Sequence, residues 1–412
     1  MGEIMTLRCV TCGIEYPPHA VEYTCLACGP RRGTLEVVYD YNALSRTLTR
    51  ETFEKTGIRA MWRYLPLLPI EDDRFIQPLR LGWTPVYEFP SLASDLGLSR
   101  LYVKDDGQNP TGSYKDRASS IVVIKAQEKD RKTVTCASTG NAASSLAGFA
   151  AATELETIIF VPATAPEAKV AQLLIYGAKV FLVEGSYDVA YDLAAEAAAA
   201  FGWYNRSAAV NPFLVEGKKT GALELAEQLG WNPPDLVFVS VGDGSVISGI
   251  CKGFAELRQV GVIDRVPRVI GVQAEGAAPI ALAFKRFDGG EVTIEDLVAS
   301  TVADSICVGK PRDLVKAVRY VHANGGDFVT VSDQSILEAI VFLARHTGVF
   351  AEPAGAAAFA GLRALAGTSD LIGRSAAVII TGNGLKDVAA ARRAMGEPIV
   401  IEPTLKAIEE HL

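Results

Sequence analysis

Several classes of protein are disfavoured by what this 412-residue sequence lacks. No apolar stretch approaches the ~18 residues that a membrane-spanning helix needs. No run of Lys and Arg stands out, and the net charge of −8 disfavours a nucleic-acid-binding surface. The N-terminus, MGEIMTLRCV, has no basic and apolar leader. We therefore expect a cytoplasmic protein with neither a membrane nor a nucleic acid among its partners.

Histidine is also scarce, with four residues at positions 19, 322, 346 and 411. Neither H-E-x-x-H nor G-x-S-x-G occurs, so a zinc protease or a serine hydrolase has no support from motifs. Apolar residues make up 49% and charged residues 21% of the chain, which is a normal balance for a globular protein. The length predicts two or three domains.

Four of the seven cysteines gather near the N-terminus in two C-x-x-C-G turns, as Cys9, Cys12, Cys25 and Cys28. Each turn can direct two thiolates at one point, and four sulfurs complete a tetrahedral zinc site. A pair of disulfides is the alternative, which the absence of a secretory signal disfavours. We predict a zinc-ribbon-like segment over residues 1–41, in which the zinc is structural because no coordination position stays open.

Beyond the ribbon, apolar runs alternate with alanine-rich helical runs up to about residue 402. The runs that predict buried strands are RLYVKDD, KTVTCAS, TIIFVPA, KVFLVEG, DLVFVSVG, RVIGVQAE and AAVIITG. This alternation is typical of α/β proteins with parallel sheets that helices cover on both faces. The series is too long for one sheet. We predict a large α/β domain over residues 42–130 plus 206–412, with a small α/β domain, 131–205, inserted in it.

Three of the predicted strands end in loops that could hold a ligand, because ligands bind at the carboxyl ends of parallel strands. In the first, residues 242–246 (GDGSV) suit a phosphate, since glycines and a helix start present free N–H groups. A dinucleotide site or a plain turn is the alternative, although Ile247 stands where a third glycine is expected. The loops 138–145 (STGNAASS) and 381–387 (TGNGLKD) could hold a carboxylate or simply cap a helix.

One lysine has unusual flanking residues within the segment NPTGSYKDRASS, residues 109–120. Lys115 lies between Tyr114 and Asp116, where a turn meets a helical pattern. A lysine on the surface does not require such a fixed position, whereas a lysine that must reach a ligand from a loop does. A framed lysine, a phosphate loop and a hydroxyl at a strand end (Thr381) together match what pyridoxal phosphate (PLP) requires.

These motifs resemble the threonine synthase family of fold-type II PLP enzymes. The likeness covers nearly the whole chain, including the ribbon, and GSYKDR and TGNGLKD are its most specific motifs. It implies two doubly wound α/β domains of the tryptophan synthase β-like kind. It also implies that Lys115 binds the cofactor aldehyde, that Asn141 contacts the ring 3′-oxygen and that Thr381 faces the pyridine nitrogen.

The resemblance assigns two further groups of residues. The implied ligands of the cofactor phosphate are Gly242, Asp243, Gly244, Ser245 and Val246. The implied ligands of the substrate carboxylate are Ser138, Thr139, Gly140 and Asn141. The implied activity is a PLP-dependent carbon–oxygen lyase of threonine biosynthesis that converts O-phosphohomoserine to threonine, in an enzyme that we expect to be a homodimer.

The chain departs from the family in one segment. Where the family has N-S-x-N-P-x-R before E-G-Q-K-T, this chain reads AAVNPFLVEGKKT. Residues that usually grip the substrate phosphate are replaced by Ala208, Ala209, Leu214 and Ala142. We hypothesise that Lys218, with Arg206, binds the substrate in their place.

Two other functions stay open. A serine/threonine dehydratase-like or β-replacement enzyme would act on a non-phosphorylated amino acid, and the missing phosphate ligands favour it. The K-D-R triplet and the ribbon favour threonine synthase instead. A nucleotide-binding or regulatory protein is the third possibility, and the absorbance of bound PLP would exclude it.

Overall fold

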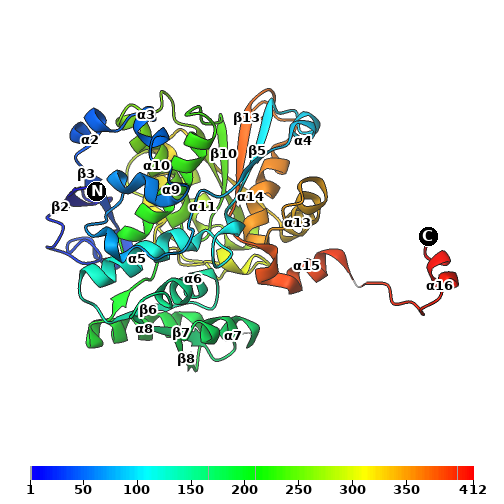
Figure 1. The fold of residues 1–412 in the computed structure, drawn as a ribbon, viewed down its shortest axis with the longest axis horizontal. Helices are drawn as coiled ribbons and strands as arrows, with labels where there is room; N and C mark the ends of the chain where they lie inside the picture. Colours follow the sequence, from blue (N-terminus) through cyan, green and yellow to red (C-terminus); the bar gives the residue numbers. More distant parts are fainter. Residues whose placement is uncertain (1, 166, 209, 397) are drawn as a thin grey trace.

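The computed structural model describes residues 2–165, 167–208, 210–396 and 398–412. Its strands form three sheets, and helices pack between and around them (Figure 1). Among the residues described, no helix is long and apolar enough to cross a membrane.

The N-terminal sheet is small and antiparallel, in the order β2-β1-β3. Its strands are β1 (Ile4–Cys9), β2 (Glu15–Tyr16) and β3 (Leu35–Tyr39). Lysines of two helices hold β3 against the body of the protein. Lys252 Nζ donates to the carbonyl oxygen of Val37, and Lys316 Nζ donates to that of Leu35 at 2.8 Å. The ribbon is therefore packed on the rest of the chain.

The largest sheet has six strands in the order β12-β11-β10-β13-β5-β4. All neighbours are parallel except β4, which runs antiparallel to β5. The strands are β4 (Val86–Glu88), β5 (Arg100–Asp105), β10 (Leu236–Ser240), β11 (Arg268–Ala274), β12 (Asp327–Val331) and β13 (Ser375–Ile380). A second parallel sheet has the order β8-β7-β6-β9. Its strands are β6 (Thr133–Ala137), β7 (Glu156–Pro162), β8 (Lys179–Val183) and β9 (Tyr204–Asn205).

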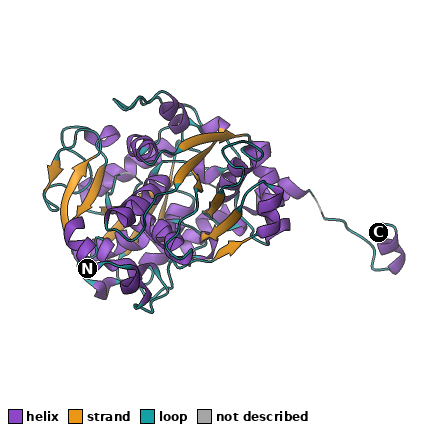
Figure 2. Cartoon of the chain, turned by 90° about the horizontal axis from the view of Figure 1, so that it is seen from above, coloured by secondary structure: helices purple, strands orange, loops and turns teal. Residues whose placement is uncertain are grey.

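Helices cover both faces of the parallel sheets, as Figure 2 shows from above. The longer helices are α5 (Lys115–Glu128), α6 (Asn141–Ala150), α7 (Glu167–Ile175), α8 (Tyr187–Phe201), α9 (Phe213–Gln228), α10 (Ser245–Gln259), α12 (Leu314–Ala323), α13 (Asp333–Thr347) and α14 (Pro353–Ala364). The shorter ones are α1 (Gly29–Arg32), α2 (Tyr41–Thr47), α3 (Arg50–Glu54), α4 (Pro90–Asp95), α11 (Pro279–Lys285), α15 (Val388–Met395) and α16 (Leu405–Glu409). In both views α16 lies away from the body of the protein.

The central strands are buried on both faces, which explains their continuous apolar sequence. On β10, Val237 and Val239 belong to the core cluster that contains α10, whereas Phe238 belongs to the cluster that contains α14. Successive side chains of a strand point to opposite faces of the sheet, so β10 contributes apolar side chains to both hydrophobic clusters.

The predicted α/β class is confirmed, and each of the seven predicted strands is present. Sequence reasoning missed β4, β9 and β12. The first two have three and two residues, and β12 is a half-exposed edge strand without a long apolar run. The domain boundaries at residues 41, 130 and 205 stay a prediction.

Helices α5 and α9 approach at backbone distance, and this contact fixes the helix that begins with Lys115. A Cβ added to Gly217 would overlap the carbonyl oxygen of Arg117, and one added to Gly221 would overlap the hydroxyl of Tyr114. Glycine is therefore required at both positions of α9 for α5 to lie where it does.

A fully buried ion cluster reinforces this contact. Arg117 donates from Nε to Asp106 Oδ2 at 2.6 Å, and from Nη1 and Nη2 to the two oxygens of Glu224 at 2.6 and 2.7 Å. Lys104 Nζ also donates to Glu224, at 2.9 Å. Two cations thus balance two carboxylates across α5, α9 and the end of β5. These ion pairs explain the arginine of the K-D-R triplet.

We expect Arg117→Met to lower the free energy of unfolding by about 3–5 kcal/mol, because it leaves two buried carboxylates with too little positive charge. Arg100→Met is the matched control, since the Arg100 side chain is 64% exposed and its loss should change stability by less than about 0.5 kcal/mol. Guanidinium denaturation of both variants provides the measurement. Equal effects would mean that the cluster does not stabilise the fold.

Candidate functional site

A cavity of about 650 Å³ opens where the carboxyl ends of the two parallel sheets meet. Its walls come from the loops that follow β6, β9, β10 and β13 and from the start of α5. All the residues that the sequence assigned to cofactor and substrate line this one cavity, namely Lys115, Ser138, Thr139, Gly140, Asn141, Lys218, Gly242, Asp243, Gly244, Ser245, Val246 and Thr381. Their roles stay predictions, but the fold brings them together.

Lys115 is held by backbone contacts on both sides. The N–H of Tyr114 donates to the carbonyl oxygen of Thr381 at 2.9 Å, which joins the start of α5 to the end of β13. The carboxylate of Asp116 accepts the N–H of Thr111 at 2.7 Å and closes the preceding turn. The residues that flank Lys115 therefore form a hydrogen-bonded turn, and Lys115 lines the cavity from it.

The amine of Lys115 is buried and interacts with the charges of Arg206, Glu352 and Asp243. Burial, reinforced by the charge of Arg206, lowers the pKa of Lys115 below its usual value. Burial, together with the charges of Lys115 and Arg206, lowers the pKa of Lys218 well below its usual value. At Lys115 the lowered pKa favours the neutral amine, which is the form that attacks an aldehyde or accepts a proton. At Lys218 a bound anion would raise the pKa again and favour the charged ammonium.

Residues 242–246 form a cradle that fits a phosphate. Gly242 admits no side chain, because a Cβ there would lie 2.8 Å from the Cα of Ile306. Gly244 has a φ of 93° and directly precedes the first residue of α10, Ser245. The Ser245 hydroxyl is buried and, within the described residues, has no hydrogen-bond partner. A helix N-terminus with a spare hydroxyl is a favourable site for the anionic end of PLP.

The side chain of Asp243 has a different role from its neighbours in the cradle. Its Oδ1 accepts the N–H of Arg312 at 2.6 Å, and its carbonyl oxygen accepts the N–H of Asp313 at 3.1 Å. The carboxylate therefore anchors the loop that follows residue 309. What Asp243 can offer a phosphate is its backbone N–H.

The loop 138–141 begins α6, and its side chains are already in contact with one another. Ser138 Oγ accepts the N–H of Gly140 at 3.1 Å. Asn141 Nδ2 donates to Oε1 of Glu352 at 2.7 Å. This bond fixes the amide of Asn141 at the cavity wall, where the sequence places a contact to the cofactor ring.

Sequence reasoning missed Glu352, which directly precedes α14 and lines the cavity. Burial raises the pKa of its carboxyl group, and its N–H donates to the carbonyl oxygen of Gly382 at 3.1 Å. The signal was a lone acid inside the small and apolar run AEPAGAAA. An acidic residue in such an apolar run is seldom buried unless its carboxylate is paired with another group.

The positions that depart from the family divide into two groups. Ala142 and Ala208 line the cavity, where they offer no polar side chain. Leu214 is fully buried in the apolar core at the start of α9 and is not among the lining residues. Ala209 lies outside the described residues.

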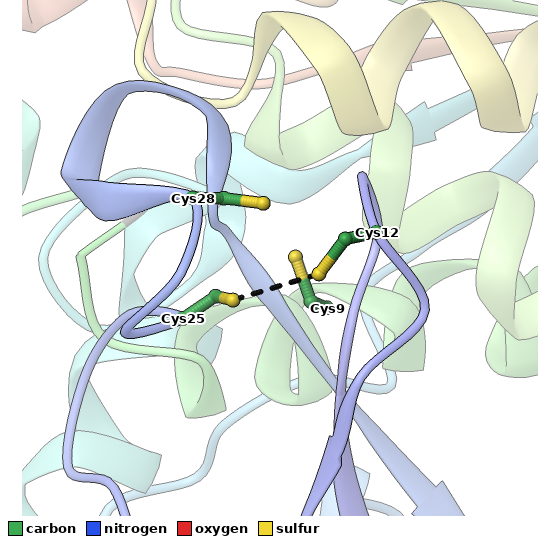
Figure 3. Close-up of side chains that lie close together, drawn as sticks. All are labelled: Cys9, Cys12, Cys25 and Cys28. Carbon is green, nitrogen blue, oxygen red and sulfur yellow. Dashed lines mark hydrogen bonds between the residues drawn. The ribbon is translucent and has the colours of Figure 1, made fainter.

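The four N-terminal cysteines converge as predicted, and Figure 3 shows their sulfurs directed toward one point. All four sulfurs lie within 4.8 Å of one another, and those of Cys12 and Cys25 are 3.7 Å apart. Zn–S bonds of ~2.3 Å in a tetrahedron require sulfurs ~3.8 Å apart. None of the chain's cysteines is in a disulfide. The cluster is compatible with a structural zinc ion.

Comparison with known proteins identifies the class. The family described as pyridoxal-phosphate dependent enzyme matches residues 78–382. The threonine synthase of Methanocaldococcus jannaschii is 40% identical over 99% of both chains, and that of Methanosarcina acetivorans is 38% identical over 98% of both. Among solved structures, threonine deaminase isoform 2 from Solanum lycopersicum has a TM-score of 0.67 at 23% identity, over 81% of this chain and 92% of that one. The last comparison supports the fold alone.

The chain therefore belongs to the pyridoxal-phosphate-dependent enzymes of fold-type II. Within that class it is a threonine synthase-like lyase, as its identity to threonine synthases over nearly the full length shows. The resemblance, the enzyme class and the cofactor predicted from the motifs are confirmed.

We expect the purified protein to contain about one zinc ion per chain, because four sulfurs form a closed site. Cys25→Ser should lower the zinc content and the melting temperature. Cys251→Ser, which changes a buried cysteine of α10, should leave the zinc content unchanged. Elemental analysis gives the answer, and full zinc content in Cys25→Ser would contradict the four-sulfur site.

Proposed function

We propose that the enzyme converts O-phosphohomoserine and water to threonine and inorganic phosphate. The observation that carries this proposal is the shared cavity, in which Lys115, the loop 242–246 and Thr381 meet. The relatives that match over nearly the whole chain carry the name threonine synthase, which supports the choice of substrate.

The cofactor would be held at both of its ends. Lys115 would bind it covalently, while the N–H groups of 242–246 and the Ser245 hydroxyl would hold its phosphate. Thr381 would face the pyridine nitrogen, and a neutral hydroxyl, unlike an aspartate, does not force that nitrogen to stay protonated. When bound, PLP supplies an acceptor for the electron pair released at the substrate Cα.

The substrate would be oriented by the start of α6. Ser138, Thr139, Gly140 and Asn141 would surround the α-carboxylate. The N–H groups of Thr139 and Asn141 would donate to it, because those of Ser138 and Gly140 already donate to the carbonyl oxygen of Phe160 and to Ser138 Oγ. The amine of Lys115, released when the substrate binds, would take the Cα proton and then a Cβ proton. The C–O bond at Cγ would break, and phosphate would leave with the electron pair and one proton. Cγ would then gain a proton to become the methyl group, the oxygen of water would bond to Cβ with loss of one proton, and Cα would regain a proton.

We also propose that the enzyme is a cytoplasmic homodimer that binds neither nucleic acid nor membranes. The family resemblance supports the dimer. The net charge of −8 supports the absence of a nucleic-acid partner.

Reconstitution with PLP should give an absorbance band near the edge of the visible range, and borohydride should trap the cofactor on the chain. In Lys115→Ala no trapped cofactor should remain after denaturation, because no other residue forms the bond. Lys132→Ala removes an exposed lysine near β6 and is the control. Peptide mapping that places the trapped cofactor on another lysine would overturn the assignment.

A turnover screen distinguishes the proposed activity from the alternative. With O-phosphohomoserine we expect phosphate and threonine in equal amounts. With serine or threonine we expect no ammonia above the background rate. Ammonia from these amino acids, without turnover of the phosphate ester, would instead support a dehydratase-like enzyme, which the absence of polar side chains at Ala142 and Ala208 favours.

A further inference from the structure

Two cations in the cavity wall are buried without a negative partner. Arg206 and Lys218 are each 1% exposed. Within the described part of the chain, neither forms an ion pair within 4.0 Å of a carboxylate. Arg206 Nε donates to Ser119 Oγ at 3.1 Å, while its Nη2 is buried with no partner. Burying an unpaired cation costs several kcal/mol, so the site is built to receive an anion.

The carboxylates nearest to these cations are otherwise engaged or out of reach. Asp243 accepts the N–H of Arg312, and Asp116 accepts that of Thr111. Asp313 is paired with Lys316, whose Nζ lies 3.6 Å from its Oδ1, although within the described residues its carboxylate accepts no hydrogen bond. These acids moderate the local positive charge, but among the described residues none of them forms an ion pair with Arg206 or Lys218, and Nη2 of Arg206 has no hydrogen-bond partner.

The other anions expected in the cavity already have binding sites. The cradle 242–246 suits the cofactor phosphate, and the start of α6 suits a carboxylate. Arg206 directly follows β9 and lines the cavity, as does the small residue Ala208, two residues later. Donors remain for one more anionic group.

We propose that Arg206 and Lys218 together bind a phosphate monoester on the side chain of the substrate. This rests on the proposed function of the cavity, and it deepens that function by naming which residues recognise the substrate. The two cations take over from the Asn, Ser and Arg that threonine synthases usually carry at the positions of Ala208, Ala209 and Leu214.

The chemistry of the two side chains suits this role. A guanidinium presents a planar fork of donors that matches two phosphate oxygens, and an ammonium adds a compact charge. Ser119 lies one turn after Lys115 on α5, so its bond to Arg206 places the guanidinium beside the reactive amine. Positive charge at this position also favours the departure of phosphate as an anion.

The decisive variants are Arg206→Met and Lys218→Gln, the latter restoring the residue usual in the family. With O-phosphohomoserine we expect each to raise KM by about ten- to a hundredfold, the value of a charge-assisted hydrogen bond. The inhibition constant of inorganic phosphate should rise in parallel, while PLP absorbance stays constant. Arg206→Lys retains the charge and should recover part of the loss. Lys132→Met, which removes an exposed cation, is the matched control.

Direct binding of inorganic phosphate to the holoenzyme, by calorimetry, separates this proposal from the proposed function. In the holoenzyme the cofactor occupies its own cradle, so added phosphate reports the second site. If O-phosphohomoserine is not turned over but Arg206→Met weakens phosphate binding tenfold or more, the proposed reaction fails and the anion site stands. O-phosphoserine, assayed alongside, then tests whether the substrate is a phosphate ester with a side chain shorter than that of O-phosphohomoserine.

Two results would overturn the proposal. One is an unchanged KM and an unchanged phosphate affinity in Arg206→Met with full PLP content. The other is loss of PLP from Lys218→Gln with unchanged phosphate affinity, which would assign Lys218 to the cofactor phosphate instead.

Discussion

The structure depends on the buried ion cluster in which Arg117 joins Asp106 and Glu224. Asp106 and Arg117 are 11 residues apart, whereas Glu224 lies 107 residues beyond Arg117, and all three side chains are fully buried. Removing one partner leaves the others charged in a medium of low dielectric, so the cluster favours a single arrangement of α5 against α9. Since α5 begins with Lys115, the cluster also sets where the reactive amine lies. The glycines of α9 permit the close approach that these short ion pairs require.

The cavity shows the opposite electrostatic arrangement. Arg117 is paired with two carboxylates, whereas in the part of the chain that the structure describes Arg206 and Lys218 form no ion pair in the cavity wall. Charge that is unbalanced without ligand lowers stability, and an anion that enters the cavity recovers that free energy as affinity. Burial, reinforced by the charge of Arg206, lowers the pKa of Lys115, which favours its neutral amine.

The ribbon is tied to the same helices through a second buried network. Tyr39, at the end of β3, donates to Glu216 at 2.8 Å. Glu216 also accepts from Lys219 at 2.5 Å and from Lys252 of α10. Glu216 and Lys218 lie two residues apart on α9, while α10 carries the phosphate cradle at its start. The ribbon is therefore bonded to α9, which carries Lys218, and through Glu216 to α10, which follows the loop 242–246.

The sequence alone determined the α/β class, the main strands and the cysteine cluster, because periodicity and C-x-x-C spacing are local signals. It also predicted roles for Lys115 and the loop 242–246 from motifs of fixed spacing, and the fold brings these residues to one cavity. Only the tertiary structure decided that Glu352 reaches Asn141 and that, among the described residues, Arg206 is buried without a carboxylate partner. Such pairings join residues far apart in the chain, and whether a charge finds a partner depends on packing that no local pattern encodes.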